Sequence, residues 1–222
     1  HGQFCLSHYY RPKDDGLSLI TNLVAKPDFV SVAPFISFMS FIAIAVVLCF
    51  LLIPQFAVVD ATLLSWLSLP KAVLVGSMLL LYRSSYEEIR TRDLLQGRNA
   101  FFSTLAGVVV FGLWINMDWT LGSQSVPAGF NPDNFPDERL KWLMIVIRVT
   151  GAVVIVPIME ELFWRSFLLR YLINANFTTV AIGRFSLFSF IAVSLLFGLE
   201  HHYVFAGIMA GVFFNGIYYY TK

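Results

Sequence analysis

The sequence predicts an all-α, polytopic membrane protein, and three observations support this fold class. Of the 222 residues, 58% are hydrophobic and 13% are charged, and the mean hydropathy is +0.72. Soluble domains, by contrast, average roughly 25% charged residues. Several apolar runs have the roughly 17 to 25 residues that a helix needs to cross a hydrocarbon core of about 30 Å. No alternating pattern of about ten residues suggests a membrane barrel. We therefore expect a transmembrane helix bundle with at least six spans.

Charge and cysteine content exclude other classes. The formal net charge of +1 comes from 15 basic and 14 acidic residues, which form no basic stripe, so nucleic acid is not an expected partner. Cys5 and Cys49 lie too far apart for a disulfide framework or a zinc motif. Residues 1–30 contain no signal peptide with an apolar core and cleavage site. The chain opens on His1, so processing or truncation is expected at its termini.

The spans are expected in a fixed order, with topology set by the arginines between them. Residues 83–100 contain four arginines, and the positive-inside rule places this loop and the N-terminal segment 1–30 in the cytoplasm. The loop 118–138 then lies outside, and its aromatic residues favour the membrane interface. The expected spans are 32–53, 63–82, 100–117, 140–173, 185–201 and 204–220.

Two of these segments carry structural signals of their own. The run 140–173 would be about 50 Å long as a single helix, which exceeds a bilayer, and Pro157 is the expected kink. In the last span, Gly207 and Gly211 form a small-xxx-small face that permits close helix packing.

Three charged residues lie within the apolar run 140–173, namely Glu160, Glu161 and Arg165. A charge at membrane depth costs roughly 2.5 to 3.5 kcal/mol on insertion scales, so a functional role is the first hypothesis. Glu161 and Arg165 are spaced i, i+4 and can pair, whereas Glu160 points about 100° away around the helix. Glu160 is therefore the expected free carboxylate.

The next span ends in a histidine that can meet this carboxylate. Phe197 and His201 are spaced i, i+4 and share a helix face. Counted from the loop between the two helices, Glu160 and His201 lie roughly 21 and 26 Å along their helices. A carboxylate and an imidazole in a semi-dry cavity can activate water, which predicts peptide hydrolysis. Ser166 has no G-x-S-x-G elbow around it, and Cys49 is isolated.

These residues resemble a known family. Glu160-Glu161-x-x-x-Arg165, followed by Phe197-x-x-x-His201, looks like the first two motifs of the CPBP intramembrane proteases, which include CAAX prenyl endopeptidases and bacteriocin-processing relatives. The flanking sequence is particularly similar to the bacterial "CAAX prenyl protease-related" branch.

The resemblance implies a glutamate-dependent membrane protease. Glu160 and His201 would activate water, while Glu161, Arg165 and Phe197 would brace the site. The family also uses an HxxxN pair as oxyanion donor, which the sequence lacks, and Asn215 is no substitute because position 211 is Gly. We therefore expect residues 31–222 to form a CPBP-like transmembrane domain that is incomplete at its C-terminus.

Several alternatives stay open. The charged residues could form a structural ion cluster, and a structural role is expected for Glu200 and His202. Zinc could be held by Glu160, Glu161, His201 and His202, although no HExxH motif is present, and a tetrapyrrole could be ligated by either histidine. The main expectation is no cofactor and no metal.

The other class of function is non-enzymatic: a catalytically inactive, protease-like scaffold or binding subunit of a larger membrane complex. For the enzyme, the expected partners are a membrane-anchored or lipidated peptide substrate and the lipid bilayer. The expected location is the bacterial cytoplasmic membrane, with a cytoplasmic N-terminus.

Overall fold

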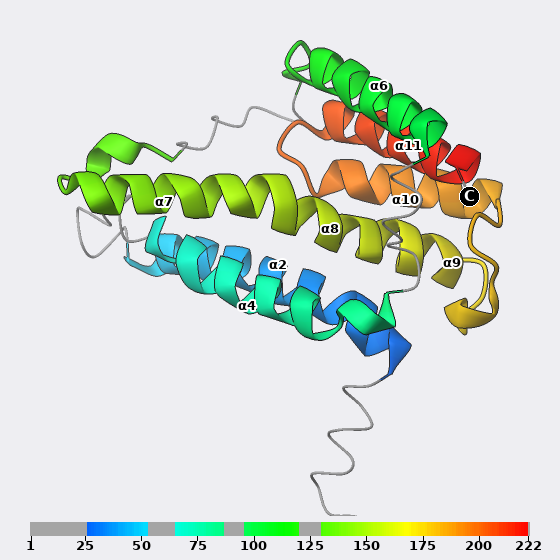
Figure 1. The fold of residues 1–222 in the computed structure, drawn as a ribbon, viewed down its shortest axis with the longest axis horizontal. Coiled ribbons are helices and arrows are strands. Elements are labelled where there is room, and N and C mark those ends of the chain that lie inside the picture. Colours follow the sequence, from blue (N-terminus) through cyan, green and yellow to red (C-terminus); the bar gives the residue numbers. More distant parts are fainter. Residues whose placement is uncertain (1–25, 53–64, 87–95, 120–129, 222) are drawn as a thin grey trace, which may run out of the picture.

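The computed structural model describes residues 26–52, 65–86, 96–119 and 130–221, and every structural statement below concerns these residues (Figure 1). No strand occurs among them, which confirms the all-α class. Most of the expected cytoplasmic segment 1–30 lies outside the described residues. So do the expected end of the first span at residue 53 and the expected start of the second span at residue 63. The elements are α2 (Pro27–Leu52), α4 (Ser68–Leu81), η1 (Arg83–Ser85), α6 (Gly97–Trp114), η2 (Pro132–Asn134), α7 (Glu138–Thr150), η3 (Gly151–Ile155), α8 (Val156–Glu160), η4 (Glu161–Leu168), α9 (Leu169–Tyr171), η5 (Phe177–Thr179), α10 (Leu187–Leu199) and α11 (Val204–Thr221).

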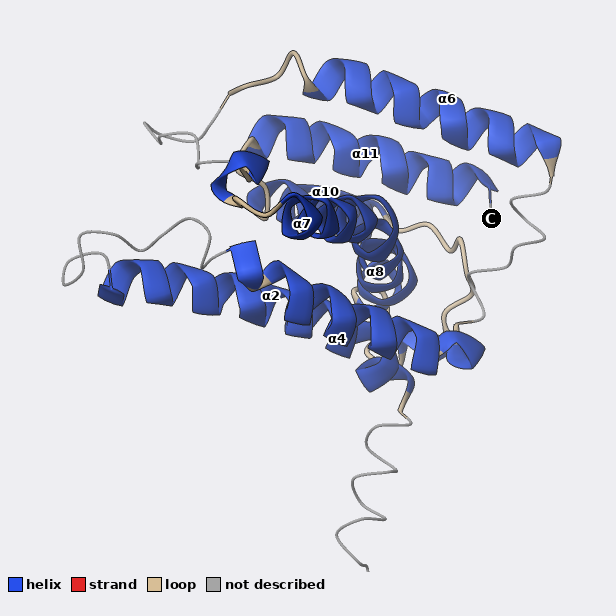
Figure 2. Cartoon of the chain, turned by 60° about the vertical axis from the view of Figure 1, so that its left-hand side comes forward, coloured by secondary structure: helices blue, strands red, loops and turns tan. Residues whose placement is uncertain are grey.

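The helices form three layers (Figures 1 and 2). Helices α2 and α4 lie side by side on one face of the bundle. A continuous helical rod, Glu138–Tyr171, runs through the middle and includes α7, η3, α8, η4 and α9. Helices α10 and α11 lie on its other face, and α6 packs on the outer side of α11. The middle rod therefore contacts both outer layers, and the charged motif lies on it.

Three described helical segments are long and apolar enough to cross a membrane, namely Pro27–Leu48, Glu138–Tyr171 and Val204–Thr221. Two shorter apolar helices, Ser68–Leu81 and Leu187–Leu199, are below that length. Each expected apolar segment contains a helix, although several of these helices begin or end a few residues inside the expected bounds, and the prediction of at least six spans is not confirmed.

The middle rod stays helical through Pro157 rather than breaking there. Proline lacks a backbone N–H and its ring crowds the carbonyl four residues earlier. The segment just before it, Gly151–Ile155, is π-helical, and a second π-helical segment follows at Glu161–Leu168. These wider turns accommodate the proline within one rod, and the second contains Glu161 and Arg165.

Glycines allow α10 and α11 to pack at backbone distance, as the small-xxx-small pattern predicts. A Cβ atom on Gly207 would lie 2.8 Å from the Gly198 Cα atom, and one on Gly211 would lie 3.1 Å from the Ser194 Cα atom. A Cβ atom on Gly198 would lie 2.3 Å from a side-chain carbon of Ile208. We call Gly198, Gly207 and Gly211 the glycine contact. The predicted packing face is confirmed.

Candidate functional site

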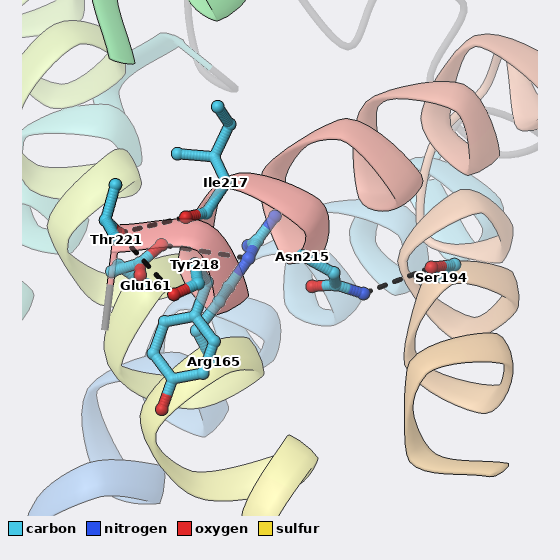
Figure 3. A network of polar contacts seen from close by, with 7 residues as sticks. All are labelled: Glu161, Arg165, Ser194, Asn215, Ile217, Tyr218 and Thr221. Carbon is cyan, nitrogen blue, oxygen red and sulfur yellow. Dashed lines mark hydrogen bonds and ion pairs between the residues drawn. The ribbon is translucent and has the colours of Figure 1, made fainter. Parts of the chain in front are cut away.

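The ion pair predicted at i, i+4 is present in the middle rod. Arg165 Nε lies 3.7 Å from Glu161 Oε2 (Figure 3). The two partners differ in exposure, because the Arg165 side chain is 3% exposed and that of Glu161 is 52% exposed. At this distance the contact is an ion pair without a hydrogen bond at Nε. The arginine is therefore the buried member of the pair.

The Arg165 guanidinium lies between two aromatic rings from the neighbouring layer. Its central carbon is 4.8 Å from the ring centroid of Phe197 on α10 and 5.4 Å from that of Phe214 on α11. A buried cation gains about 2 kcal/mol from such a ring contact when desolvated. Nε and Nη2 of Arg165 are buried without a hydrogen-bond partner. Arg165 thus joins three helices and keeps donor capacity.

Glu160 is half-buried at the last residue of α8, where the helix passes into the π-helical segment. It interacts electrostatically with Arg165, Glu161 and Glu200. Single π-helical turns inside α-helices are frequent at functional sites. The carboxylate is therefore within electrostatic range of the buried Arg165 guanidinium.

His201 has one ring nitrogen engaged and one free. Its Nδ1 lies 2.6 Å from the Phe197 carbonyl oxygen. Because a carbonyl only accepts, Nδ1 must carry the hydrogen, and in the neutral ring Nε2 is left with a lone pair. The imidazole is 4.6 Å from the Phe197 ring and 5.2 Å from that of Trp114, between centroids. It is half-buried and in the tautomer that a general base at Nε2 requires.

Glu160 and His201 share one electrostatic partner, the guanidinium of Arg165. Among the described residues no hydrogen bond joins Glu160 to His201 directly. We call Glu160, Glu161, Glu200 and His201, together with the central Arg165, the Arg165 cluster.

Glu200 joins this cluster although the sequence favours a structural role for it. Helix α10 ends at Leu199, earlier than the expected boundary at His201, and the His201 N–H closes a tighter turn on the Gly198 carbonyl at 3.0 Å. The tighter turn changes the direction of the residues after Leu199, so helical spacing no longer describes them. Glu200 interacts electrostatically with Glu160 and Arg165, and its Oε2 is buried without a partner. Its sequence position, directly before His201, was the available signal.

Other buried polar atoms surround the cluster. The Trp164 indole nitrogen lies near the Glu200 carboxylate without hydrogen-bond geometry, and His202 Nε2 is buried without a partner. Buried polar groups are normally paired with protein or water, so such orphans call for an explanation. Five buried donors or acceptors without a protein partner, on Trp164, Arg165, Glu200 and His202, fit a site that receives water or a polar ligand.

Asn215 lies on α11 and faces α10 (Figure 3). It is fully buried, and its Nδ2 donates to Ser194 Oγ at 3.1 Å. Ser194 Oγ in turn donates to the Phe190 carbonyl at 2.8 Å. One hydrogen of the amide nitrogen is thus used in packing α11 against α10, and the Asn215 Oδ1 is buried without a partner.

No group of three or more His, Cys, Asp or Glu in the described ranges is arranged to hold a metal ion. The two neighbouring histidines differ in the burial of Nε2. The Nε2 of His202 is buried without a hydrogen-bond partner, whereas that of His201 is not among the buried atoms that lack a partner.

Fold and site together define an all-helical integral membrane protein with a polar centre between its middle rod and one outer layer. The family described as "Type II CAAX prenyl endopeptidase Rce1-like" matches residues 141–222. This stretch contains both motifs, so the resemblance to the CAAX prenyl endopeptidases is confirmed for it, and the family is one of proteases. No curated protein and no solved structure matches the chain.

Proposed function

We propose that this protein is an intramembrane endopeptidase that cleaves a membrane-anchored or lipidated peptide, with Glu160 and His201 activating the attacking water. Glu161, Arg165 and Phe197 hold the two catalytic groups in place. The proposal includes at least six membrane spans, a cytoplasmic N-terminus and a bacterial cytoplasmic membrane. No cofactor is required.

In this reaction a water oxygen attacks the scissile carbonyl carbon while its proton passes to His201 Nε2 or to Glu160. The carbon–nitrogen bond of the tetrahedral intermediate then breaks, and the same proton is delivered to the leaving amine. A positioned acid or base contributes about 10²- to 10⁴-fold to the rate of such a step. The Nδ1 contact to Phe197 keeps Nε2 unprotonated in the neutral ring, which suits this role.

The observation that carries the proposal is the Arg165 cluster itself. A half-buried carboxylate and an imidazole with a free Nε2 converge on one buried guanidinium. Intramembrane ionisable groups are costly and mark functional sites. Buried atoms without partners, including Arg165 Nη2 and Glu200 Oε2, keep hydrogen-bonding capacity that a water or a polar substrate group can use.

The test is cleavage of a fluorogenic prenylated peptide with a CAAX ending by membranes that contain the native full-length protein. We expect Glu160→Gln and His201→Gln each to reduce cleavage by about 10²- to 10⁴-fold. Glu138→Gln is the matched control, because Glu138 is an exposed carboxylate at the start of the same rod and should leave cleavage unchanged.

If either variant still cleaves the peptide at the rate of the wild-type protein, the proposed catalytic pair is contradicted. A native protein that cleaves no lipidated peptide, and that purifies as a subunit of a large membrane complex, would instead support the inactive scaffold. Folding of each variant is checked by its helical circular dichroism, so that loss of fold is not read as loss of chemistry.

A further inference from the structure

A second polar site lies in the other half of the molecule, between α2, α4 and the middle rod. It is a partly open cavity of about 190 Å³. A single water occupies roughly 10–15 Å³ in the same measure, so the cavity admits a much larger group. Two positively charged side chains from different helices line it, Lys71 of α4 and Arg148 of α7. Ser68 and Phe38 also line the cavity.

The two cations are held in place by uncharged contacts. Lys71 Nζ lies 4.3 Å from the Phe38 ring centroid, and the Arg148 guanidinium carbon lies 5.1 Å from that of Phe130. Arg148 Nη1 donates to Ser68 Oγ at 3.2 Å, which leaves the serine hydroxyl hydrogen free to donate in turn. Both side chains are thus oriented without using up their charge.

Within the described ranges neither cation has an acidic partner. The ion pairs found there are Lys141 with Asp133 and Arg165 with Glu161. Lys71 and Arg148 instead interact with each other, like charge against like charge, and Lys71 is half-buried. Two neighbouring positive charges, one of them half-buried, repel each other, and a bound anion would offset that cost.

We propose that this cavity binds a phosphate group. Arginine presents a planar fork of donors that matches phosphate oxygens, and a lysine ammonium adds a point charge. The Ser68 hydroxyl supplies a further donor between them. A phosphate carries enough negative charge to balance both cations and enough oxygens to accept from all three side chains.

The cavity lies near side chains that are typical of the headgroup level of a bilayer. Trp66, just before α4, is 39% exposed, and Trp142, on the same rod as Arg148, is 61% exposed. Exposed tryptophans mark the headgroup level of a bilayer. Arg148 is itself exposed, so the site can be reached from outside the bundle. A phospholipid headgroup and free phosphate present the same chemistry there.

The test uses the full-length protein in detergent with three probes. Native mass spectrometry compares adducts of phosphatidic acid with adducts of a diacylglycerol that has the same chains and no phosphate. Isothermal titration measures inorganic phosphate. The variants are Lys71→Gln and Arg148→Gln, and Lys141→Gln is the control because it removes one positive charge from the same helix as Arg148.

We expect the wild-type protein to retain phosphatidic acid and not diacylglycerol. Lys71→Gln and Arg148→Gln should each weaken phosphatidic acid retention about tenfold or more, while Lys141→Gln leaves it unchanged. The same pattern with inorganic phosphate alone would support the site and assign it to a soluble ligand. Equal retention in all three variants, or retention of diacylglycerol as strong as that of phosphatidic acid, would overturn the proposal.

A charge-conserving variant guards against misfolding. Lys71→Arg keeps the positive charge at the cavity and should retain phosphate binding if charge is what matters. Loss of binding in Lys71→Arg, with the helical circular dichroism intact, would count against the site.

Discussion

The glycine contact and the Arg165 cluster adjoin each other at the end of α10, and they differ in how their space is filled. At the glycine contact, the absence of side chains lets two backbones meet, with a Cβ on Gly207 only 2.8 Å from the Gly198 Cα. At the Arg165 cluster, long polar side chains converge and several of their buried atoms have no protein partner. The first region is filled and closed, whereas the second keeps unused polar capacity.

The two regions are also connected. A Cβ on Gly207 would lie 3.2 Å from the His201 Cβ, so the close approach of the helices sets where the histidine can lie. Interiors are close-packed, and a change of one methylene is felt by neighbours. The tight packing of α10 against α11 therefore constrains the position of His201 in the Arg165 cluster, and substitutions can separate the two contributions.

The largest effect is expected at the glycine contact. Gly207→Leu should lower the free energy of unfolding by about 3 kcal/mol, because the new side chain meets the Gly198 backbone, which cannot rotate away. Gly216→Leu on the same helix is the control, since nothing lies within 4 Å of its Cβ position. Thermal unfolding in detergent measures both, and equal stability of the two variants would show that the helices are not held by this contact.

The next effect concerns the two partners of the ion pair. Arg165→Met should cost about 2–3 kcal/mol of unfolding free energy, because it removes both ring contacts and leaves nearby carboxylates without their cation. Glu161→Gln should cost at most about 1 kcal/mol, since the Glu161 side chain is 52% exposed and its charge is screened by its surroundings. Chemical denaturation of each variant is the measurement. Equal losses would contradict the assignment of Arg165 as the centre of the cluster.

The smallest effect on stability, with a larger one on activity, is expected at Glu200. Its carboxylate interacts electrostatically with Arg165, and in the proposed mechanism this shared charge balance keeps Glu160 available to water. Glu200→Gln should therefore draw Glu160 toward Arg165 and reduce cleavage of the prenylated peptide about tenfold, or about 1.4 kcal/mol. The melting temperature should stay close to that of the wild-type protein. Unchanged cleavage would return Glu200 to the structural role that the sequence favours.

Much of the fold was predictable because its signals are local. Apolar runs of sufficient length predicted the helices, and the Gly207 and Gly211 spacing predicted close packing, which the structure confirms. The i, i+4 spacing of Glu161 and Arg165 predicted their pairing. Helix ends were predicted less well, since α10 stops at Leu199 rather than at His201. This difference of two residues changes the direction of the side chains that follow Leu199.

The sequence by itself determined the all-α class, the order of the helices and the two motifs that match a protease family over residues 141–222. These follow from hydropathy and from spacing along one helix, which depend on neighbours in the chain. Only the tertiary structure brought Glu200 to Arg165 and placed Lys71 beside Arg148. Such contacts join different helices, and their geometry depends on where each helix ends and how closely the layers approach.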